Sequence, residues 1–426
     1  MTRTKTNLVK IANAFRLPSK KRAGICEKYV TFSQKREFLL YYYLQKQKNV
    51  VKYIRLNAEV FALRILGLSL HHYRNYDTLE LAPDPGLNVF EGLNAAGKTN
   101  ILESVFLCAL GRSHRTSRDA ELLAEHEPFG SVRLFLDTRG GSRTIKIELY
   151  DGERKKVFLD DAPTARTGEL MGCLNVVMFS PEDLQLVKDG PAERRRFLDM
   201  ELSQLKPAYY YDLQQYNNAL KNRNLLLKET PLRYDMIELW DEQLSKLGSR
   251  IVLARASFVE ELSMLAKALH LRMSDGKEQL SVSYEPSVPF ADEERLMETL
   301  MEQLTERLER DIFRGFTSVG PHRDDLGLRL NGRDVRVYGS QGQQRTTALS
   351  LKLSEIELIR RSRGEYPVLL LDDVFSELDG DRQARLLEVV SPCQAFVTCT
   401  HLEEFASIES LSMQVWHVEN GVVSEV

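Results

Sequence analysis

The chain has 426 residues, of which 43% are hydrophobic and 28% are charged, and its net charge is −3. These values are typical of a globular protein large enough for more than one domain. No apolar run reaches the length of a transmembrane helix, and no secretory signal is visible. The sequence therefore excludes a membrane-spanning or secreted protein. Because the five cysteines form no C-x-x-C pair, we expect reduced thiols and no metal site at Cys26, Cys108, Cys173, Cys393 and Cys399.

The first 58 residues differ in charge from the rest of the chain. They hold 14 of the 58 Lys and Arg residues, and their only acids are Glu27 and Glu37. Such a basic stretch could be a nucleic-acid-binding arm, but it shows no clear hydrophobic period. We expect residues 1–58 to be a disordered extension or the result of a start site assigned too far upstream. The ordered protein is expected to begin near Val60.

A glycine-rich loop follows the first predicted strands, at residues 62–66, 79–81 and 86–90. Residues 92–99 fit the pattern G-x-x-x-x-G-K-[ST] at every constrained position, and a helix is predicted from Thr99 to Leu110. Backbone N–H groups of such a loop surround phosphate oxygens at the positive end of the helix. An ordinary strand–helix turn is the alternative, but the strand–loop–helix setting favours nucleotide binding. The predicted nucleotide-binding residues are Gly92, Leu93, Asn94, Ala95, Ala96, Gly97, Lys98 and Thr99.

Alternating apolar and polar residues predict an antiparallel sheet after this helix. The three predicted strands cover residues 131–137, 143–150 and 155–160, and Asp151-Gly152 is a tight-turn signal between two of them. The sheet is expected to lie beside the nucleotide-binding core.

The pattern becomes helical from Pro191. Long helical patterns cover residues 191–229 and 232–274, and a third helix is predicted at 291–311. Sustained heptads are absent, so a long coiled coil is not expected. We interpret these segments as a helical lobe inserted into the first domain.

Strands return after about Phe313. Residues 326–330 and 334–338 flank Asn331-Gly332, the strongest short hairpin signal. A helix at 343–361 follows, then a fully apolar strand at 368–371, and a last strand is predicted at 395–398.

Two acids follow the apolar strand. Asp372 stands where a phosphate-loop protein holds Mg²⁺, and Asp373 could polarise an attacking water. A pair of helix-capping acids is the alternative. The phosphate loop earlier in the chain favours the catalytic interpretation.

A second small-residue motif, Gly339-Ser340-Gln341-Gly342-Gln343, opens the predicted helix at 343–361. A serine at a helix N-terminus can bind an anion. The motif is weak in isolation, because two glycines after a hairpin could be a simple turn. Its order relative to the phosphate loop and Asp372 strengthens it.

The order of these motifs resembles that of an ABC-type ATPase head of the SMC clan, interrupted by a helical insertion. Over residues 60–426 the chain is similar to the RecF family of bacterial DNA replication and repair proteins. The motifs that carry this resemblance are 73–76 (Tyr-Arg-Asn-Tyr), 111–116 (Gly-Arg-Ser-His-Arg-Thr), 179–184 (Phe-Ser-Pro-Glu-Asp-Leu), 193–199 (Glu-Arg-Arg-Arg-Phe-Leu-Asp), 320–326 (Gly-Pro-His-Arg-Asp-Asp-Leu), 339–345 (Gly-Ser-Gln-Gly-Gln-Gln-Arg) and 370–379 (Leu-Leu-Asp-Asp-Val-Phe-Ser-Glu-Leu-Asp).

The resemblance implies specific roles for the motifs. ATP would be bound by residues 92–99, with Lys98, Asp372 and Asp373 as the catalytic residues and with Thr99 and Asp372 holding Mg²⁺. Ser340 and Gly342 would contact the γ-phosphate bound to a second copy of the chain, so that an ATP-dependent homodimer forms the complete sites. Asp379 would lie in the loop that crosses the dimer interface.

Two further roles of the family cannot be carried over to single residues. The position of the usual metal-sensing Gln holds Pro181, Glu182 and Asp183. The switch His is either His401 or replaced by Thr398 to Thr400. Asp373 stands where most ABC ATPases have Glu, so slow hydrolysis is expected.

Duplex DNA binding is expected from two arginine clusters. Arginines there would contact phosphates without reading sequence, and a solvated face or pairing with nearby acids is the alternative for each cluster. The candidates are Arg112, Arg115 and Arg118 after the first helix, and Arg194, Arg195 and Arg196 at the start of the helical lobe.

The predicted fold is therefore α/β, an ABC-type P-loop ATPase head with a mixed sheet, an antiparallel β-subdomain and an inserted α-helical lobe. The predicted division is 1–58 extension, 59–188 first half of the head, 189–312 helical lobe and 313–426 second half of the head. The resemblance implies a weak, DNA-stimulated ATPase that acts on gapped DNA with RecO and RecR, helps load RecA and takes part in the SOS response. Cytoplasmic, nucleoid-associated localisation without a membrane is implied as well. Another SMC-clan clamp or a nuclease-linked ATPase remains the alternative.

Overall fold

The computed structural model describes residues 63–290, 292–378, 380–402 and 413–426. Residues 60–426 form one compact unit, which is the subject of the following paragraphs. The predictions made for residues 1–58 and for Asp379 lie outside the described residues. No helix in the described part of the chain is long and apolar enough to cross a membrane. The cysteines at positions 108, 173, 393 and 399 in this part of the chain form no disulfide with one another.

A mostly parallel sheet forms the centre of the ATPase head. Its order is β15-β14-β3-β13-β12-β8, and every pair from β14 to β8 is parallel. The inner strands are apolar and buried, as both covered faces of a parallel sheet require. The strands are β3 (Leu87–Glu91), β8 (Val176–Phe179), β12 (Val368–Leu371), β13 (Ala395–Cys399), β14 (Met413–Glu419) and β15 (Val422–Glu425).

The strand predicted at 395–398 is confirmed as β13, but the prediction that it is the last strand is wrong. Strands β14 and β15 follow, and β14 pairs in parallel with β3 at the centre of the sheet. β14 alternates buried and exposed residues, and its hairpin partner β15 is largely exposed, so neither has the apolar run that marks the inner strands.

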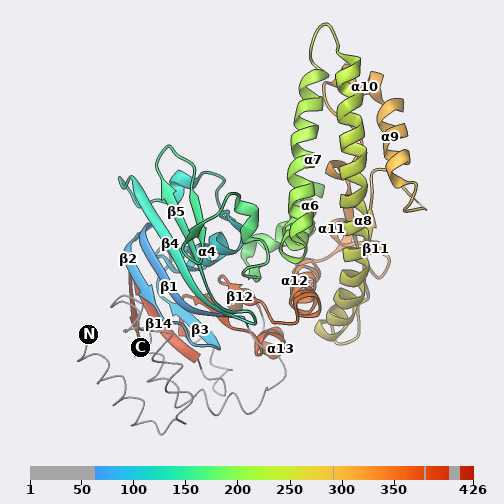
Figure 1. Ribbon diagram of the computed structural model, residues 1–426. Helices are drawn as coiled ribbons and strands as arrows, with labels where there is room; N and C mark the ends of the chain where they lie inside the picture. The colour runs from blue at the N-terminus through green and yellow to red at the C-terminus, as the bar shows by residue number, and fades with distance from the viewer. Residues whose placement is uncertain (1–62, 291, 379, 403–412) are drawn as a thin grey trace, which may run out of the picture. The chain divides into compact units, whose positions relative to one another are not determined.

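An antiparallel sheet of order β2-β1-β4-β5-β6-β7 covers the other side of the head (Figure 1). Its strands confirm the alternation predicted at 131–137, 143–150 and 155–160, and Gly152 adopts a positive φ of 74° in the predicted turn. The strands are β1 (Arg64–Tyr73), β2 (Tyr76–Leu81), β4 (Phe129–Thr138), β5 (Gly141–Tyr150), β6 (Lys156–Leu159) and β7 (Ala162–Pro163).

Helix α4 (Lys98–Leu110) packs between the two sheets. Eleven of its residues are buried, and its apolar side chains belong to the same cluster as those of β1, β4 and β5 and as Leu370 and Phe396 of the parallel sheet. A helix that is buried on all sides needs no polar face. The first helical turn, at the end of β3, is thereby fixed from two directions.

The helical segments form an arm, seen beside the head in Figure 1. The predicted helix at 191–229 is divided at Lys206, because Pro207 cannot donate the backbone hydrogen bond that would continue α6 into α7. Helix α8 is 40 residues long, which corresponds to about 60 Å at the usual rise per residue. The arm helices are α6 (Pro191–Leu205), α7 (Pro207–Leu226), α8 (Tyr234–Met273), α9 (Leu296–Glu306) and α10 (Leu308–Arg314).

A three-stranded sheet lies at the foot of the arm, in the order β11-β10-β9, with β9 (Leu280–Glu285), β10 (Asp325–Leu330) and β11 (Arg333–Asp334). The Asn331-Gly332 turn is confirmed, with φ angles of 50° and 81°. The strand predicted at 334–338 is wrong beyond Asp334, whose side chain accepts from the N–H groups of Arg336 and Val337 and starts the short helix α11 (Val335–Tyr338).

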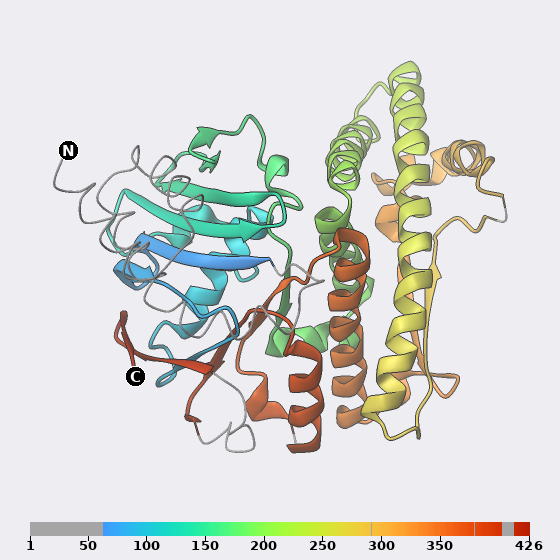
Figure 2. The same cartoon turned by 60° about the horizontal axis from the view of Figure 1, so that its bottom comes forward.

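Helix α12 (Gln341–Arg363) joins the arm to the head. It runs alongside α8, as Figure 2 shows, and also contacts β8 and α6. The remaining elements are η1 (Asp119–Leu122), η2 (Thr167–Leu170), η3 (Pro181–Leu184), α5 (Gln185–Lys188), η4 (Pro321–Arg323), η5 (Phe375–Glu377) and α13 (Gly380–Val390). The mixed α/β architecture agrees with the predicted fold class, whereas the domain boundaries at 188 and 312 stay a prediction.

Candidate nucleotide-binding site

The glycine-rich loop lies between β3 and α4, as the sequence predicts. Gly97 caps α4 with φ 116°, and a β-carbon at this position would lie 2.4 Å from the Asn75 side chain and 2.8 Å from the Tyr76 hydroxyl. Only glycine fits both the conformation and the space. Lys98 is buried, and its Nζ donates to the carbonyl oxygens of Gly92 and Leu93 at 2.5 and 2.9 Å. The ammonium group is therefore held inside the loop, where phosphate oxygens would take over its contacts.

Two side chains of the turn between β1 and β2 support the loop. Asn75 Nδ2 donates to the Ala96 carbonyl oxygen at 2.9 Å, and the Tyr76 hydroxyl donates to that of Gly97 at 3.0 Å. The sequence analysis quoted these residues only as part of a family motif. Their spacing of about 20 residues from the loop gives no local signal, because the contact exists only once β1 and β3 are brought together.

The C-terminal hairpin also contacts the loop. A β-carbon on Gly92 would lie 2.2 Å from the Val418 carbonyl oxygen in β14, and the Gly421 N–H donates to the Ala96 carbonyl oxygen at 3.3 Å. Gly92 is thus required by close backbone approach. The sequence analysis missed this support because it placed no strand after residue 398.

The structure brings Thr99 and Asp372 together. The Thr99 hydroxyl donates to Asp372 Oδ1 at 2.9 Å, and the Thr398 hydroxyl donates to the same oxygen at 2.8 Å. Burial is the first cause that raises the pKa of Asp372, and the nearby carboxylates of Glu182 and Asp373 add to it, while the two hydroxyls oppose the shift. A hydroxyl and a carboxylate at this distance form the kind of oxygen donor set that binds Mg²⁺ together with phosphate oxygens.

Asp373 stands beside this pair in a left-handed conformation, with φ 52°. Its N–H donates to the Thr398 hydroxyl at 2.9 Å. The left-handed conformation costs free energy for a residue other than glycine, and such costs cluster at functional sites. Thr398 therefore contacts both acids, whereas the choice between His401 and Thr398 to Thr400 for the switch residue stays a prediction.

The loop at η3 separates the two acids that the sequence could not distinguish. Asp183 accepts from the Ser180 N–H at 2.8 Å and turns into the protein, where burial raises its pKa to about 6. Glu182 is exposed and acts electrostatically on Asp372. Pro181 and Asp183 line a pocket together with Asp373, whereas Glu182 is linked to the site by its charge, so the metal-sensing role stays unassigned among these three residues.

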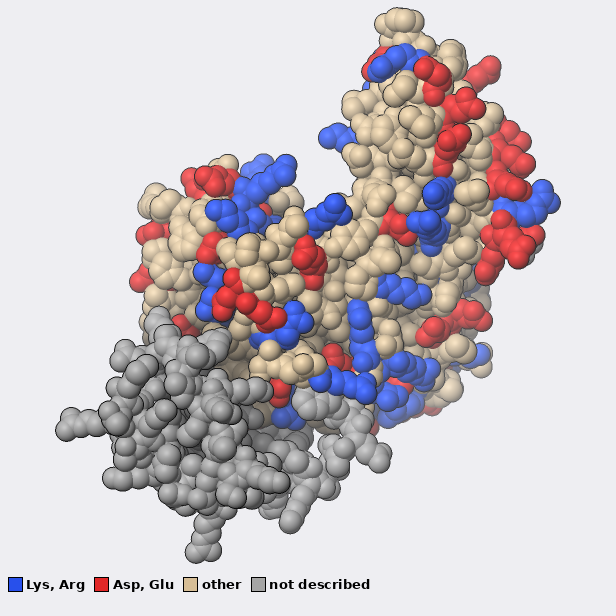
Figure 3. All heavy atoms as spheres, viewed as in Figure 1, with Lys and Arg blue, Asp and Glu red and all other residues tan. Residues whose placement is uncertain are grey.

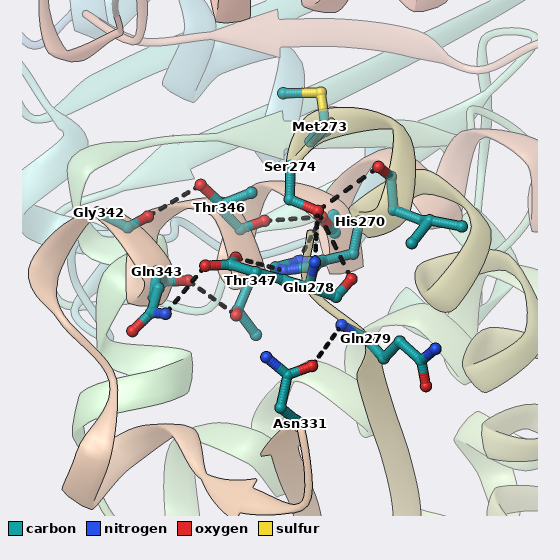
Figure 4. Close-up of polar contacts among 12 residues, drawn as sticks. His270, Met273, Ser274, Glu278, Gln279, Asn331, Gly342, Gln343, Thr346 and Thr347 are labelled. Atoms are coloured by element: carbon teal, nitrogen blue, oxygen red, sulfur yellow. Dashed lines mark hydrogen bonds and ion pairs between the residues drawn. The ribbon is translucent and has the colours of Figure 1, made fainter. Parts of the chain in front are cut away.

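Ser340 and Gly342 lie at the exposed N-terminus of α12 (Figure 4). Ser340 Oγ accepts from the Gln343 N–H at 3.2 Å, and Gln343 Oε1 accepts from the Ser340 N–H at 2.8 Å. This capping box satisfies two backbone donors at the start of the helix. Among the described residues, Ser340 makes its hydrogen bonds within this first turn, so a single chain does not join Ser340 to its own phosphate loop.

The six predicted DNA-contacting arginines fall into different environments. Arg194 is buried, and its guanidinium donates to both carboxylate oxygens of Asp325 at 2.6 and 2.9 Å. Arg195 donates to the Asp324 carbonyl oxygen at 2.8 Å. Arg194 is thus paired with an acid inside the protein, which is the alternative considered for this cluster, and Arg195 is half-buried and bonded to the backbone, so we do not include these two in the DNA surface.

Arg112 and Arg196 form a different kind of pair. Both are exposed, and the pKa of Arg112 is lowered, first by desolvation and then by the positive charge of Arg196. Arg196 also donates to the His114 carbonyl oxygen at 3.1 Å, so α6 and the loop after α4 adjoin here. Two arginines close enough to repel each other form a site that an anion would stabilise.

Arg115 and Arg118 are exposed in the loop after α4. Arg115 donates to Asn100 Oδ1 at 3.0 Å, and Arg118 lies 3.6 Å from Glu121. Figure 3 shows Lys and Arg side chains on both the head and the arm, interspersed with acids. A contiguous basic face is thus not formed on the visible side, and local arginine groups remain the candidates.

Comparison with known proteins identifies the family of the chain. A sequence profile for the RecF/RecN/SMC N terminal domain matches residues 64–424. The DNA replication and repair protein RecF of Alkaliphilus oremlandii is 44% identical over 359 residues, which cover 84% of this chain and 98% of that protein. RecF of Acetivibrio thermocellus is 46% identical over 342 residues, covering 79% and 93% of the two chains. The chain belongs to the RecF family.

Solved structures support the same assignment. The recombination mediator protein RecF-ATP in the RecFOR pathway is similar with a TM-score of 0.81 and 35% identity, covering 87% of this chain and 99% of that one. The RecF-ATPrS structure has the same score and identity. An Smc head domain with an extended coiled coil, derived from Pyrococcus furiosus, shares the fold at 17% identity and a TM-score of 0.51 over 85% of this chain and 96% of that one. This RecF-family chain therefore has the fold of an ABC-type ATPase head.

Proposed function

We propose that this protein is an ATP-dependent DNA-binding protein of recombinational repair and replication restart. In this proposal, two copies dimerise around two ATP molecules on duplex DNA at single-strand gaps, and slow hydrolysis releases them. RecO and RecR are the proposed partners in loading RecA, with the SOS response as the wider setting, and the proposed location is the cytoplasm, at the nucleoid. The solved relatives of the RecFOR pathway support the choice of partners.

The observation that carries the proposal is that the predicted nucleotide-binding residues are not all brought together within one chain. The loop, Thr99 and Asp372 are assembled there, whereas Ser340 is exposed and, in the part of the chain that the structure describes, hydrogen-bonds within its own helical turn. A second copy of the chain could supply Ser340 and Gly342 to the terminal phosphate. ATP would then act as the link between two surfaces that have little affinity for each other alone.

The chain's own groups suggest how hydrolysis would proceed. Lys98 and the loop N–H groups would hold the phosphates, and Asp373 would orient and polarise the attacking water. Mg²⁺ at Thr99 and Asp372 would neutralise charge that develops on the phosphate oxygens. Asp373 is one methylene shorter than the usual Glu, so its carboxylate would reach the water less well, which is why we expect weak ATPase activity.

DNA binding is proposed for the exposed arginines Arg112, Arg115, Arg118 and Arg196. Since residues 59–426 are acidic overall, affinity would depend on these local contacts and on the presence of two copies. Two weak sites joined by ATP gain affinity through effective concentration. DNA would in turn favour the dimer and stimulate hydrolysis, because linked binding equilibria are reciprocal.

Sedimentation with ATP and a gapped DNA duplex tests the proposal. The wild-type protein should sediment as a dimer on DNA, and Lys98→Ala should remain monomeric. Ser340→Arg should bind ATP like the wild type but fail to dimerise, because a bulky cation would replace the small hydroxyl in the interface. A wild-type protein that stays monomeric with ATP and ignores DNA would refute the proposal.

A further inference from the structure

The first turn of α12 is anchored to the foot of the arm by one side chain, Glu278 (Figure 4). Glu278 lies between α8 and β9, and its Oε1 accepts from Gln343 Nε2 at 2.9 Å. Its other oxygen, Oε2, lies 3.2 Å from His270 Nε2 on the last turns of α8. The carboxylate thus joins α8 to Gln343, which completes the capping box at the start of α12. We call this first turn of α12, with Ser340, the signature turn.

Gln343 has both ends of its amide in use. Its Oε1 accepts from the Ser340 N–H at 2.8 Å, while its Nε2 donates to Glu278. An amide held at both ends has one orientation, in which its oxygen is always presented to Ser340. Without Glu278 the side chain could rotate or flip, and the capping box around Ser340 would lose its external support.

His270 fixes Glu278 in turn. The ring is completely buried, and Nδ1 lies 3.2 Å from Ser350 Oγ, which donates to the Thr346 carbonyl oxygen at 2.7 Å. Because the Glu278 carboxylate can only accept, the imidazole proton lies on Nε2, and Nδ1 accepts from the Ser350 hydroxyl when that hydroxyl turns from Thr346 to the ring. Residues of α8 and of the second turn of α12 therefore hold the imidazole, and the Glu278 carboxylate lies between it and Gln343.

The position of Glu278 suits this task electrostatically. The N-terminus of α12 carries a partial positive charge from its backbone dipoles, and a carboxylate beside it is stabilising. The side chain is 22% exposed, which leaves it partly desolvated and well ordered by two partners. Glu278 contacts none of the predicted ATP-binding residues at 92–99. We therefore relate its contacts to the orientation of Ser340.

We propose that Glu278 is a positioning residue for the signature serine: by orienting Gln343 it presents Ser340 in the geometry that the phosphate of a second copy requires, and it links that geometry to the foot of the arm. The inference rests on the proposed dimerisation around ATP. It adds a residue that contacts neither nucleotide nor DNA.

Two substitutions of Glu278 separate its hydrogen bonds from its charge. Glu278→Ala removes both contacts and should weaken ATP-dependent dimerisation about tenfold, the loss expected for a hydrogen bond to a charged group. Glu278→Gln should stay close to wild type, because its amide oxygen can accept from Gln343 and its NH₂ can donate to His270 Nε2 once the imidazole proton moves to Nδ1, which then donates to Ser350 Oγ. The affinity of the monomer for ATP should be unchanged in both, since the loop at 92–99 is untouched.

Gln343→Glu tests the link from the other side. Glutamate at this position keeps the capping box with Ser340 but places a second carboxylate against Glu278. We expect the single variant to dimerise weakly and the double variant Glu278→Gln/Gln343→Glu to recover most of the affinity. Gln279→Ala is the matched control, because the neighbouring Gln279 is exposed and joins this network through its backbone N–H, which donates to Asn331 Oδ1 at 2.9 Å.

Dimer affinity should be measured by sedimentation with ATP, and hydrogen exchange at residues 338–345 should be measured in the nucleotide-free protein. Glu278→Ala should raise exchange there, and Glu278→Gln should not. Wild-type affinity and exchange in Glu278→Ala, or no recovery in the double variant, would overturn the inference while leaving the proposed function intact. If the wild type itself fails to dimerise, the proposed function fails, and unchanged exchange in Glu278→Ala would then refute the positioning role separately.

Discussion

The two parts of the nucleotide site are built in different ways. The phosphate loop is surrounded by its own head: β14, the turn after β1 and the buried helix α4 all contact it. The signature turn at Ser340 is exposed, and its support comes from Gln343 and from Glu278 at the foot of the arm. One part is fixed before any ligand arrives, whereas the other depends on the position of a different part of the chain.

This difference suggests a division of tasks. In the proposed function, a preformed loop would bind ATP in the monomer without the cost of ordering it. Because the arm holds the signature turn, the geometry of Ser340 would depend on the position of the arm, and so would dimerisation. Substitutions should therefore separate ATP binding, which belongs to the head, from dimerisation, which requires both parts.

Lys98→Ala should have the largest effect and should break the preformed part. Loss of an ammonium group that would contact phosphate oxygens should weaken ATP binding about 100-fold or more. Isothermal titration of the monomer with ATP is the measurement. Lys267→Ala, an exposed lysine on α8, is the control and should bind ATP like the wild type. An unchanged affinity in Lys98→Ala would mean that the loop is not the nucleotide site.

The DNA surface should also map to the head and the start of α6. Arg112→Ala combined with Arg196→Ala should weaken duplex DNA binding roughly tenfold and reduce the slope of log affinity against log salt by about two. Fluorescence anisotropy at several salt concentrations measures both quantities. Arg295→Ala, an exposed arginine before α9, should change neither. Equal salt slopes in the double variant and the wild type would exclude these two arginines as phosphate contacts.

Asn75→Ala should sharpen the comparison by loosening the loop without touching phosphate. Losing the hydrogen bond to the Ala96 carbonyl oxygen should weaken ATP binding about fivefold. Without this hydrogen bond the loop would occupy its binding conformation less of the time, and the apparent affinity for ATP would fall. Asn217→Ala, an exposed residue of α7, is the control. Wild-type affinity in Asn75→Ala would show that β14 and α4 are sufficient to hold the loop.

The last prediction concerns acid stability rather than binding, and each region has a histidine that can report it. Burial lowers the pKa of His322 at the foot of the arm and of His114 in the head to about 4. Because the unfolded chain takes up these protons below about pH 6.5, the stability from each neutral ring is present at pH 7 and is lost as the pH falls from 6.5 towards 4.

Replacing His322 with Gln should therefore make the fall in unfolding free energy between pH 7 and pH 5 smaller by roughly 1–2 kcal/mol. Urea unfolding at the two pH values is the measurement, and His114→Gln gives the matching value for the head. Identical pH dependence in the wild type and His322→Gln would contradict the buried neutral state of this ring.

Much of the head could be predicted from local patterns. The apolar run at Val368–Leu371 and the alternation in β4 and β5 gave the correct strands, because burial on both faces or on one face leaves a direct record in sequence. β14 was missed because its buried side includes the polar Gln414 while its other side carries the apolar Met413 and Val415, so the apolar and polar residues do not alternate cleanly. The strand predicted at 334–338 became a helix because Asp334 caps the following turn.

The arginine predictions show the limit of reading charge from sequence. Arg194 and Arg196 are two residues apart in one run of three arginines. Arg194 is buried against Asp325, whereas Arg196 is exposed. Successive helical residues point about 100° apart, so the sequence gives the periodicity but not the identity of the facing element. That element, β10, lies about 130 residues further along the chain.

The sequence by itself determined the chemistry of the site, because a phosphate loop and a strand-ending acid need particular residue types at fixed local spacing. Only the tertiary structure decided what supports them: Asn75 and Tyr76 behind the loop, Thr398 beside both acids, and Glu278 behind the signature. These contacts join segments that are distant along the chain. Local propensity and pattern carry no information on such pairs, which exist only after the sheets and helices have packed together.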